Sequence, residues 1–98
     1  MAEKAKTDNA LLKIGEMLKG KRMALGEPYN RSRELFIERR SEELFGSEDW
    51  ISLRHLYNIE NGKNWISIEK LIVLADALEI KPEDLFSEIV AIYRNSHS

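Results

Sequence analysis

The stretch Ser52 to Gly62 constrains the fold of this chain more than any other part of the sequence. Ser52 can accept hydrogen bonds from first-turn amides, and Gly62 permits the left-handed backbone that commonly ends a helix. The sequence therefore predicts a short helix over 53–61. At about 100° per residue, it separates into two faces. The inward face consists of Leu56, Ile59 and Glu60, and the outward face of Arg54, Tyr57, Asn58 and Asn61.

Four other segments have helical patterns, and none alternates like a strand. The first begins after a capping residue among positions 7–9 and ends at Gly26 and Pro28. A second helix is predicted over 32–45, and the helix over 53–61 is the third. A fourth follows Ser67, and the last begins at Pro82. Apolar residues follow helical spacing in the first and fourth: Leu11, Ile14, Leu18 and Leu25, widened by Leu12, Met17 and Met23, and then Ile68, Leu71, Leu74, Ala75 and Leu78. The predicted fold class is all-α, with five helices.

The segment 32–45 permits two interpretations. It forms either one helix of four turns or two shorter helices that break near Ser41. A turn signal, Gly46-Ser47-Glu48-Asp49, follows it. Arg39 and Arg40 are assigned to a solvated face, because the neighbouring carboxylates Glu38, Glu42 and Glu43 would repel a phosphate.

Composition limits the classes of protein to consider. The 98 residues, 43% of them hydrophobic, suit one domain over 9–95 after a flexible tail at 1–8. The absence of cysteine excludes a disulfide framework, a zinc-thiolate site and a cysteine nucleophile. His55 and His97 lack the spacing of a metal site, so neither metal nor cofactor is expected. No run approaches the roughly 20 apolar residues of a membrane span, which predicts a cytoplasmic protein.

Charge is unevenly distributed along the chain. The net charge is -2, yet residues 1–40 carry ten Lys or Arg against six Asp or Glu, whereas 41–98 carry five against eleven. A nucleic-acid-binding surface is usually basic, and only the first half supplies an excess of positive charge. The same segregation is also compatible with ordinary solvated helix faces.

Several motifs resemble those of one family. They are Ile14-Gly15-Glu16 with Arg22, Ile59-Glu60-Asn61-Gly62, Ser67-Ile68-Glu69-Lys70-Leu71, and Pro82-Glu83-Asp84-Leu85-Phe86. Together they resemble the Cro and phage-repressor helix-turn-helix family, also called the XRE family, over residues 14–86. About ten extra residues separate Leu35-Phe36 from Ile51-Ser52, so the second helix or its following turn must be longer. Ile66 replaces the family's usual proline, and Lys21 replaces an apolar residue.

The resemblance implies that the third helix enters the DNA major groove. Arginine pairs well with guanine and asparagine with adenine, so the predicted base contacts are Arg54 and Asn58, with Tyr57 beside them. Predicted phosphate contacts lie around this helix: Arg31, Ser32, Arg33, His55, Asn61 and Lys63. For His55, the alternative is that it shields Trp50. The resemblance also implies a structural pair, Arg22 with Glu60, between the first and third helices.

The last helix, 82–95, is apolar beyond its first turn. Because a two-fold dimer can read two half-sites roughly 10 base pairs apart, this helix is predicted to mediate a homodimer. Its dimerisation residues are Leu85, Ile89, Ile92 and Tyr93. The alternative is that they only close the core of a monomer. Trp50, Trp65 and Tyr93 are interpreted as core or interface anchors rather than base-stacking groups.

The sequence thus predicts a double-stranded DNA-binding transcriptional regulator, specifically a repressor. The alternative is an antitoxin-like or partner-regulating helical module that binds protein. DNA binding needs Arg31, Arg33, Arg54 and Lys63 on one surface, whereas the alternative would use the apolar stripe of the last helix. An enzyme is not predicted, because no carboxylate lies in a motif with a nucleophile, a metal cluster or a phosphate-binding glycine loop.

Overall fold

The computed structural model describes residues 8–96, which form five α-helices and no strand. The helices are α1 (Asn9–Ala24), α2 (Arg33–Leu44), α3 (Leu53–Glu60), α4 (Ile68–Ala77) and α5 (Pro82–Ser96). The predicted all-α class with five helices is confirmed. The tail predicted at 1–8 lies outside the described residues, apart from Asp8.

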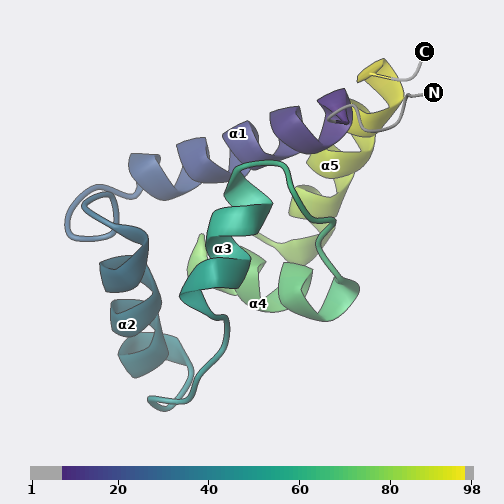
Figure 1. Cartoon of the computed structure of the whole chain (residues 1–98). Helices are drawn as coiled ribbons and strands as arrows, with labels where there is room; N and C mark the ends of the chain where they lie inside the picture. The colour runs from purple at the N-terminus through teal and green to yellow at the C-terminus, as the bar shows by residue number, and fades with distance from the viewer. Residues whose placement is uncertain (1–7, 97–98) are drawn as a thin grey trace.

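The two longest helices, α1 and α5, lie side by side and bring the start of one and the end of the other together (Figure 1). Helix α3 packs on α1, and α4 packs on α5. Helix α2 extends from the far end of α1 and contacts α3 and α4. The molecule measures 45 × 24 × 23 Å. This arrangement leaves α3 supported from behind by α1 and from one side by α2.

Side-chain caps define the helix starts. The carboxylate of Asp8 accepts a hydrogen bond from the amide of Ala10 at 2.8 Å. The hydroxyls of Ser32, Ser52 and Ser67 each accept one from the amide three residues later, at 3.0 to 3.1 Å. Each bond satisfies an amide that has no partner within its own helix. The caps predicted at Ser52 and Ser67 are confirmed.

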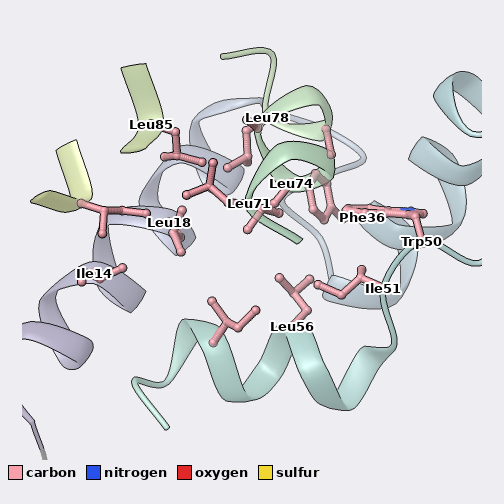
Figure 2. Close-up of a cluster of buried hydrophobic side chains, with 14 residues drawn as sticks. Ile14, Leu18, Phe36, Trp50, Ile51, Leu56, Leu71, Leu74, Leu78 and Leu85 are labelled. Carbon is pink, nitrogen blue, oxygen red and sulfur yellow. The ribbon is translucent and has the colours of Figure 1, made fainter. Parts of the chain in front are cut away.

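The core lies where all five helices meet (Figure 2). Its largest fully buried side chains are Phe36, Leu18, Leu56, Leu74 and Leu85. The predicted stripes of α1 and α4 supply Ile14, Leu18, Leu71, Leu74 and Leu78. Ile68 was expected in the core but is 62% exposed, because it lies in the first turn of α4 and points away from the core. Leu12 and Met23, at the margins of the α1 stripe, are also exposed.

Both the second helix and the connection after it are long. Helix α2 continues without a break through Ser41, whose hydroxyl donates a hydrogen bond to the carbonyl of Glu48 at 2.7 Å. The connection to α3 covers residues 45–52, compared with three or four residues in an ordinary helix-turn-helix. Trp50 and Ile51 anchor it, each 5% exposed, and the indole of Trp50 donates to the carbonyl of Ile37 at 3.0 Å. Trp50 and Ile51 therefore belong to the core, whereas residues 46–49 of the connection are exposed.

Arg40 corrects one interpretation of the sequence. It was assigned to a solvated face, yet it is 5% exposed. Its guanidinium lies 4.1 Å from the centre of the Tyr29 ring and donates hydrogen bonds to Glu43 at 2.9 Å and Glu79 at 2.7 Å. One of the three carboxylates taken as a sign of a solvated face, Glu43, is thus a partner of Arg40, and the other partner is the distant Glu79. Arg39 is exposed, as expected.

Helix α5 corrects another prediction. Leu85 is fully buried and Ile89 is 6% exposed, both within the core of the single chain. Neither side chain can contact a second copy without unfolding the first, so they are not dimerisation residues. Ile92 packs partly against the same core, and Tyr93 is 44% exposed with its ring against Trp65.

Candidate nucleic-acid interface

Helix α3 has one buried face and one open face. Leu56, Ile59 and Glu60 are each at most 5% exposed. The helix ends one residue earlier than predicted, because Asn61 is its C-cap. Gly62 follows with φ of +72°, and a Cβ there would lie 2.8 Å from the Cα of Leu12. Glycine at this position both ends α3 and allows close packing against α1.

Gly15 brings α1 against the end of α3. A Cβ at residue 15 would lie 2.5 Å from the carbonyl oxygen of Glu60 and 2.7 Å from that of Ile59. The two helices therefore meet at backbone distance. A larger residue would push the outward face of α3 away from the rest of the molecule.

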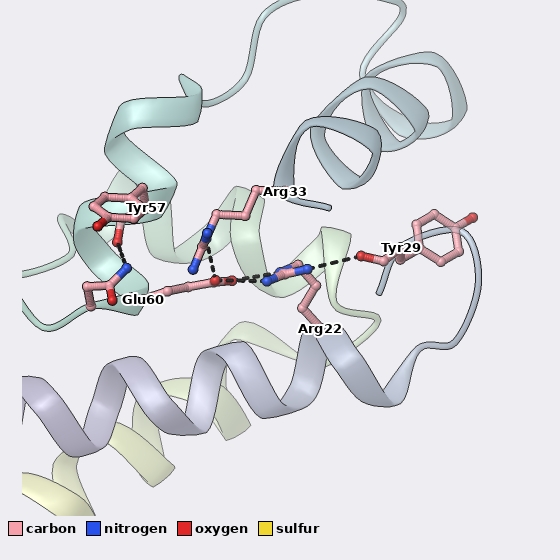
Figure 3. Close-up of polar contacts among 6 residues, drawn as sticks. Arg22, Tyr29, Arg33, Tyr57 and Glu60 are labelled. Carbon is pink, nitrogen blue, oxygen red and sulfur yellow. Dashed lines mark hydrogen bonds and ion pairs between the residues drawn. The ribbon is translucent and has the colours of Figure 1, made fainter. Parts of the chain in front are cut away.

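Arg22 and Glu60 form the main polar contact behind α3 (Figure 3). Arg22 donates two hydrogen bonds to the Glu60 carboxylate, from Nε at 2.8 Å and from Nη2 at 3.0 Å. A third, from Nη1, reaches the carbonyl of Tyr29 at 3.2 Å. The side chains are 4% and 2% exposed, so both ions are shielded from water and paired in fork geometry.

The outward face of α3 is polar and accessible. Arg54 and Asn61 are exposed, Tyr57 is 44% exposed, and Asn58 is partly exposed. Spacings of three, four and seven residues place these side chains on one stripe of the helix. Arginine and asparagine one turn apart can address neighbouring base edges along a groove.

The predicted phosphate contacts lie in different settings. Lys63 and Arg31 are exposed, and Arg31 has an ion pair of 3.4 Å with exposed Glu27. Ser32 caps α2, and His55 is partly buried. The amide of Asn61 donates to the carbonyl of Tyr57 at 2.8 Å. Arg33 binds Glu60, because its Nε donates a hydrogen bond to the carboxylate at 2.7 Å.

A family comparison identifies this arrangement. Residues 41–85 match the model of the helix-turn-helix family. The chain contains a helix-turn-helix domain. The match confirms the resemblance predicted from the sequence to the extent of this domain, and it supports a DNA-binding helix-turn-helix regulator. Comparisons with curated proteins and with solved structures gave no match.

The helix-turn-helix domain has an acidic groove beside the start of α3. The groove encloses about 740 Å³ between α2, the 45–52 connection and α4. Its walls contain five carboxylates and one amine, those of Glu34, Glu38, Glu42, Glu48, Asp49 and Lys70. Lys70 donates to the carbonyl of Trp50 at 2.7 Å. Five carboxylates against one amine make this groove unfavourable for a phosphate.

Two features of the helix-turn-helix domain were not predicted from the sequence. One is the contact of Arg33 with Glu60, and the other is the cluster of Arg40 with Tyr29, Glu43 and Glu79. An arginine three residues before Glu43 was a signal for part of the second cluster. No local pattern links Arg40 to Tyr29 or to Glu79, since the fold alone brings them together.

In residues 8–96, the range that the structure describes, no helix has the length and hydropathy needed to cross a membrane. Nor does any group of three metal-binding side chains occur within it. His97 lies beyond the described residues.

Proposed function

We propose that the protein is a sequence-specific repressor of transcription that reads double-stranded DNA with the outward face of α3. The observation that carries this proposal is the accessible stripe containing Arg54, Tyr57 and Asn58, on a helix whose opposite face is buried. A helix held so firmly loses little conformational freedom when it binds. The cytoplasmic location expected from the sequence belongs to the same proposal.

Within this proposal, Arg54 and Asn58 contact base edges, with Tyr57 between them. Arg31, Ser32, His55, Asn61 and Lys63 surround α3 and contact phosphates or sugars. Lys63 lies 5.4 Å from the centre of the Tyr57 ring, and Arg54 precedes Tyr57 by one turn, which supports a common surface. The acidic groove adjoins the start of α3 at Ser52 and Leu53, and its carboxylates disfavour a phosphate there.

The functional form is proposed to be a homodimer. A single short helix reads few base pairs, and a two-fold dimer doubles the site. Because Leu85 and Ile89 are in the core, the contact would use exposed aromatic side chains near α5, namely Trp65, Phe86 and Tyr93. Sedimentation mass at micromolar concentration tests this: a mass of one chain, with and without duplex, would contradict it.

Selection of bound sequences from a random duplex library tests the main proposal. The selection is repeated with Arg54→Ala and Asn58→Ala, each expected to lose preference at particular base pairs. Arg94→Ala is the matched control, because Arg94 is exposed on α5, away from α3. Uniform weakening would assign Arg54 and Asn58 to phosphates instead. Absence of any complex at low ionic strength would refute DNA binding.

The antitoxin-like or partner-regulating module remains a second candidate. The observation that favours it is the acidic groove, whose carboxylates suit a basic protein partner better than a nucleic acid. If the selection yields no duplex while the domain is folded, this candidate replaces the repressor.

A further inference from the structure

Arg33 faces inward, although its position at the start of α2 suggested a phosphate contact. Its Nε donates to Oε1 of Glu60 at 2.7 Å, and the side chain is only 22% exposed. Its guanidinium carbon also lies 5.1 Å from the centre of the Tyr57 ring (Figure 3). One side chain thus connects α2 to both faces of α3.

The carboxylate that holds Arg33 is itself fixed. Glu60 accepts two hydrogen bonds from Arg22 of α1, and its side chain is 2% exposed. Its carboxylate is therefore held in place inside the molecule. Glu60 cannot neutralise both Arg22 and Arg33, but the short hydrogen bond holds the Arg33 guanidinium against this fixed anion. Arg33 is therefore less accessible to a phosphate than exposed Arg31 two residues earlier.

Tyr57 is held from more than one direction. Lys63 places its ammonium 5.4 Å from the ring centre, in addition to the Arg33 guanidinium at 5.1 Å. Both distances lie within the range of cation–π attraction. Asn61 binds the Tyr57 carbonyl, which fixes the backbone beneath the ring. Tyr57 is nevertheless 44% exposed, so its ring is ordered and still available to a partner.

We propose that Arg33 is a positioning residue, which uses Glu60 as its anchor to hold the Tyr57 ring in one orientation for contact with DNA. The inference rests on the proposed function. Ordering a side chain before binding removes a cost that would otherwise reduce affinity. Loss of Arg33 should therefore act through Tyr57 and leave the number of phosphate contacts unchanged.

The experiment is a double-mutant cycle on the duplex selected by the unmodified protein. Arg33→Gln is combined with Tyr57→Leu, and affinity is measured across a salt series. We expect Arg33→Gln to weaken binding about three- to tenfold with Tyr57 present, to relax preference at the base pair nearest Tyr57, and to have no further effect in Tyr57→Leu. The salt slope should stay unchanged.

Arg31→Gln is the matched control, because it removes an exposed arginine from the same region. It should lower the salt slope by about one and weaken all sequences equally. If Arg33→Gln behaves like this control, with the same loss in both Tyr57 backgrounds, Arg33 is a phosphate contact and the proposal is wrong.

A measurement without DNA covers the case in which a variant does not fold. Side-chain coupling constants of Tyr57 in the unmodified protein should report a single χ1 rotamer, and Arg33→Lys should retain part of that order. Averaged rotamers in the free protein would overturn the proposal. If instead Tyr57 is ordered but no duplex binds, the DNA-reading function has failed while the role of Arg33 in ordering Tyr57 stands.

Discussion

The two buried arginines of this domain, Arg22 and Arg40, have similar exposure but different partners. Their side chains are 4% and 6% exposed. Arg22 binds Glu60, which is 2% exposed, whereas Arg40 binds Glu43 and Glu79, which are 39% and 66% exposed. In the Arg22 site, both the cation and the carboxylate are shielded from water. In the Arg40 site, only the cation is shielded, and its carboxylate partners are exposed.

This difference determines how much each site contributes to stability. Removing one member of a fully buried pair leaves a charge without water or a partner, which costs more than the pair itself contributes. The exposed carboxylates around Arg40 would be solvated after its loss, so they add little to the cost. Exposure of the partner, rather than of the arginine, is therefore the quantity to compare.

The largest effect is expected for Glu60→Ala. This variant leaves the buried Arg22 guanidinium without its carboxylate, and the free energy of unfolding should therefore fall by about 3 to 5 kcal/mol. Urea denaturation followed by circular dichroism measures the loss. The double variant Arg22→Met with Glu60→Leu should recover part of it, since Arg22 no longer leaves a buried charge and the remaining cation, Arg33, is 22% exposed and can be solvated. A loss below about 0.5 kcal/mol in Glu60→Ala would show that the pair does not fix α3.

A smaller loss is expected for Gly15→Ala, which tests whether the Arg22 site depends on the close approach of α1 to α3. The new Cβ would overlap the carbonyl oxygens of Ile59 and Glu60, so α1 must shift, at about 1 to 3 kcal/mol. Gly20→Ala is the matched control in the same helix. Nothing lies within 4 Å of its Cβ position, and it should gain about 0.5 to 1 kcal/mol. Equal effects at both positions would contradict the close approach.

Arg40→Met should cost less, about 1 kcal/mol, because the apolar stem is retained and its carboxylate partners become solvated. The lost contribution is mainly the cation–π contact with Tyr29 and the two hydrogen bonds. Glu79→Gln, at the exposed partner, should cost less still. A loss as large as that of Glu60→Ala would break the comparison between the two sites.

The same two arginines show what the sequence could and could not predict. Helix starts followed from local chemistry, because Ser52 and Ser67 cap the residues that come directly after them. The inward direction of Glu60 followed from helical spacing, and its partner from the resemblance. Arg40 was assigned wrongly because its surroundings depend on the fold: Tyr29 and Glu79 lie 11 and 39 residues away in the chain. The inward position of Arg33 likewise depends on where α2 meets α3.

The smallest effect concerns pH and belongs to the Arg40 site alone. The Tyr29 hydroxyl donates to the Glu43 carboxylate at 2.9 Å, and this hydrogen bond raises the pKa of Tyr29 above 10.0, with burial adding to it and Arg40 opposing it. The unfolded chain therefore releases this proton first. The stabilising contribution is complete below pH 10 and is lost as pH rises through the higher pKa of the folded protein. Urea midpoints of the unmodified protein and of Tyr29→Phe, compared from about pH 7 to about pH 11, should therefore converge above pH 10. A constant difference between them over that range would mean that Glu43 does not hold the phenol in its protonated form.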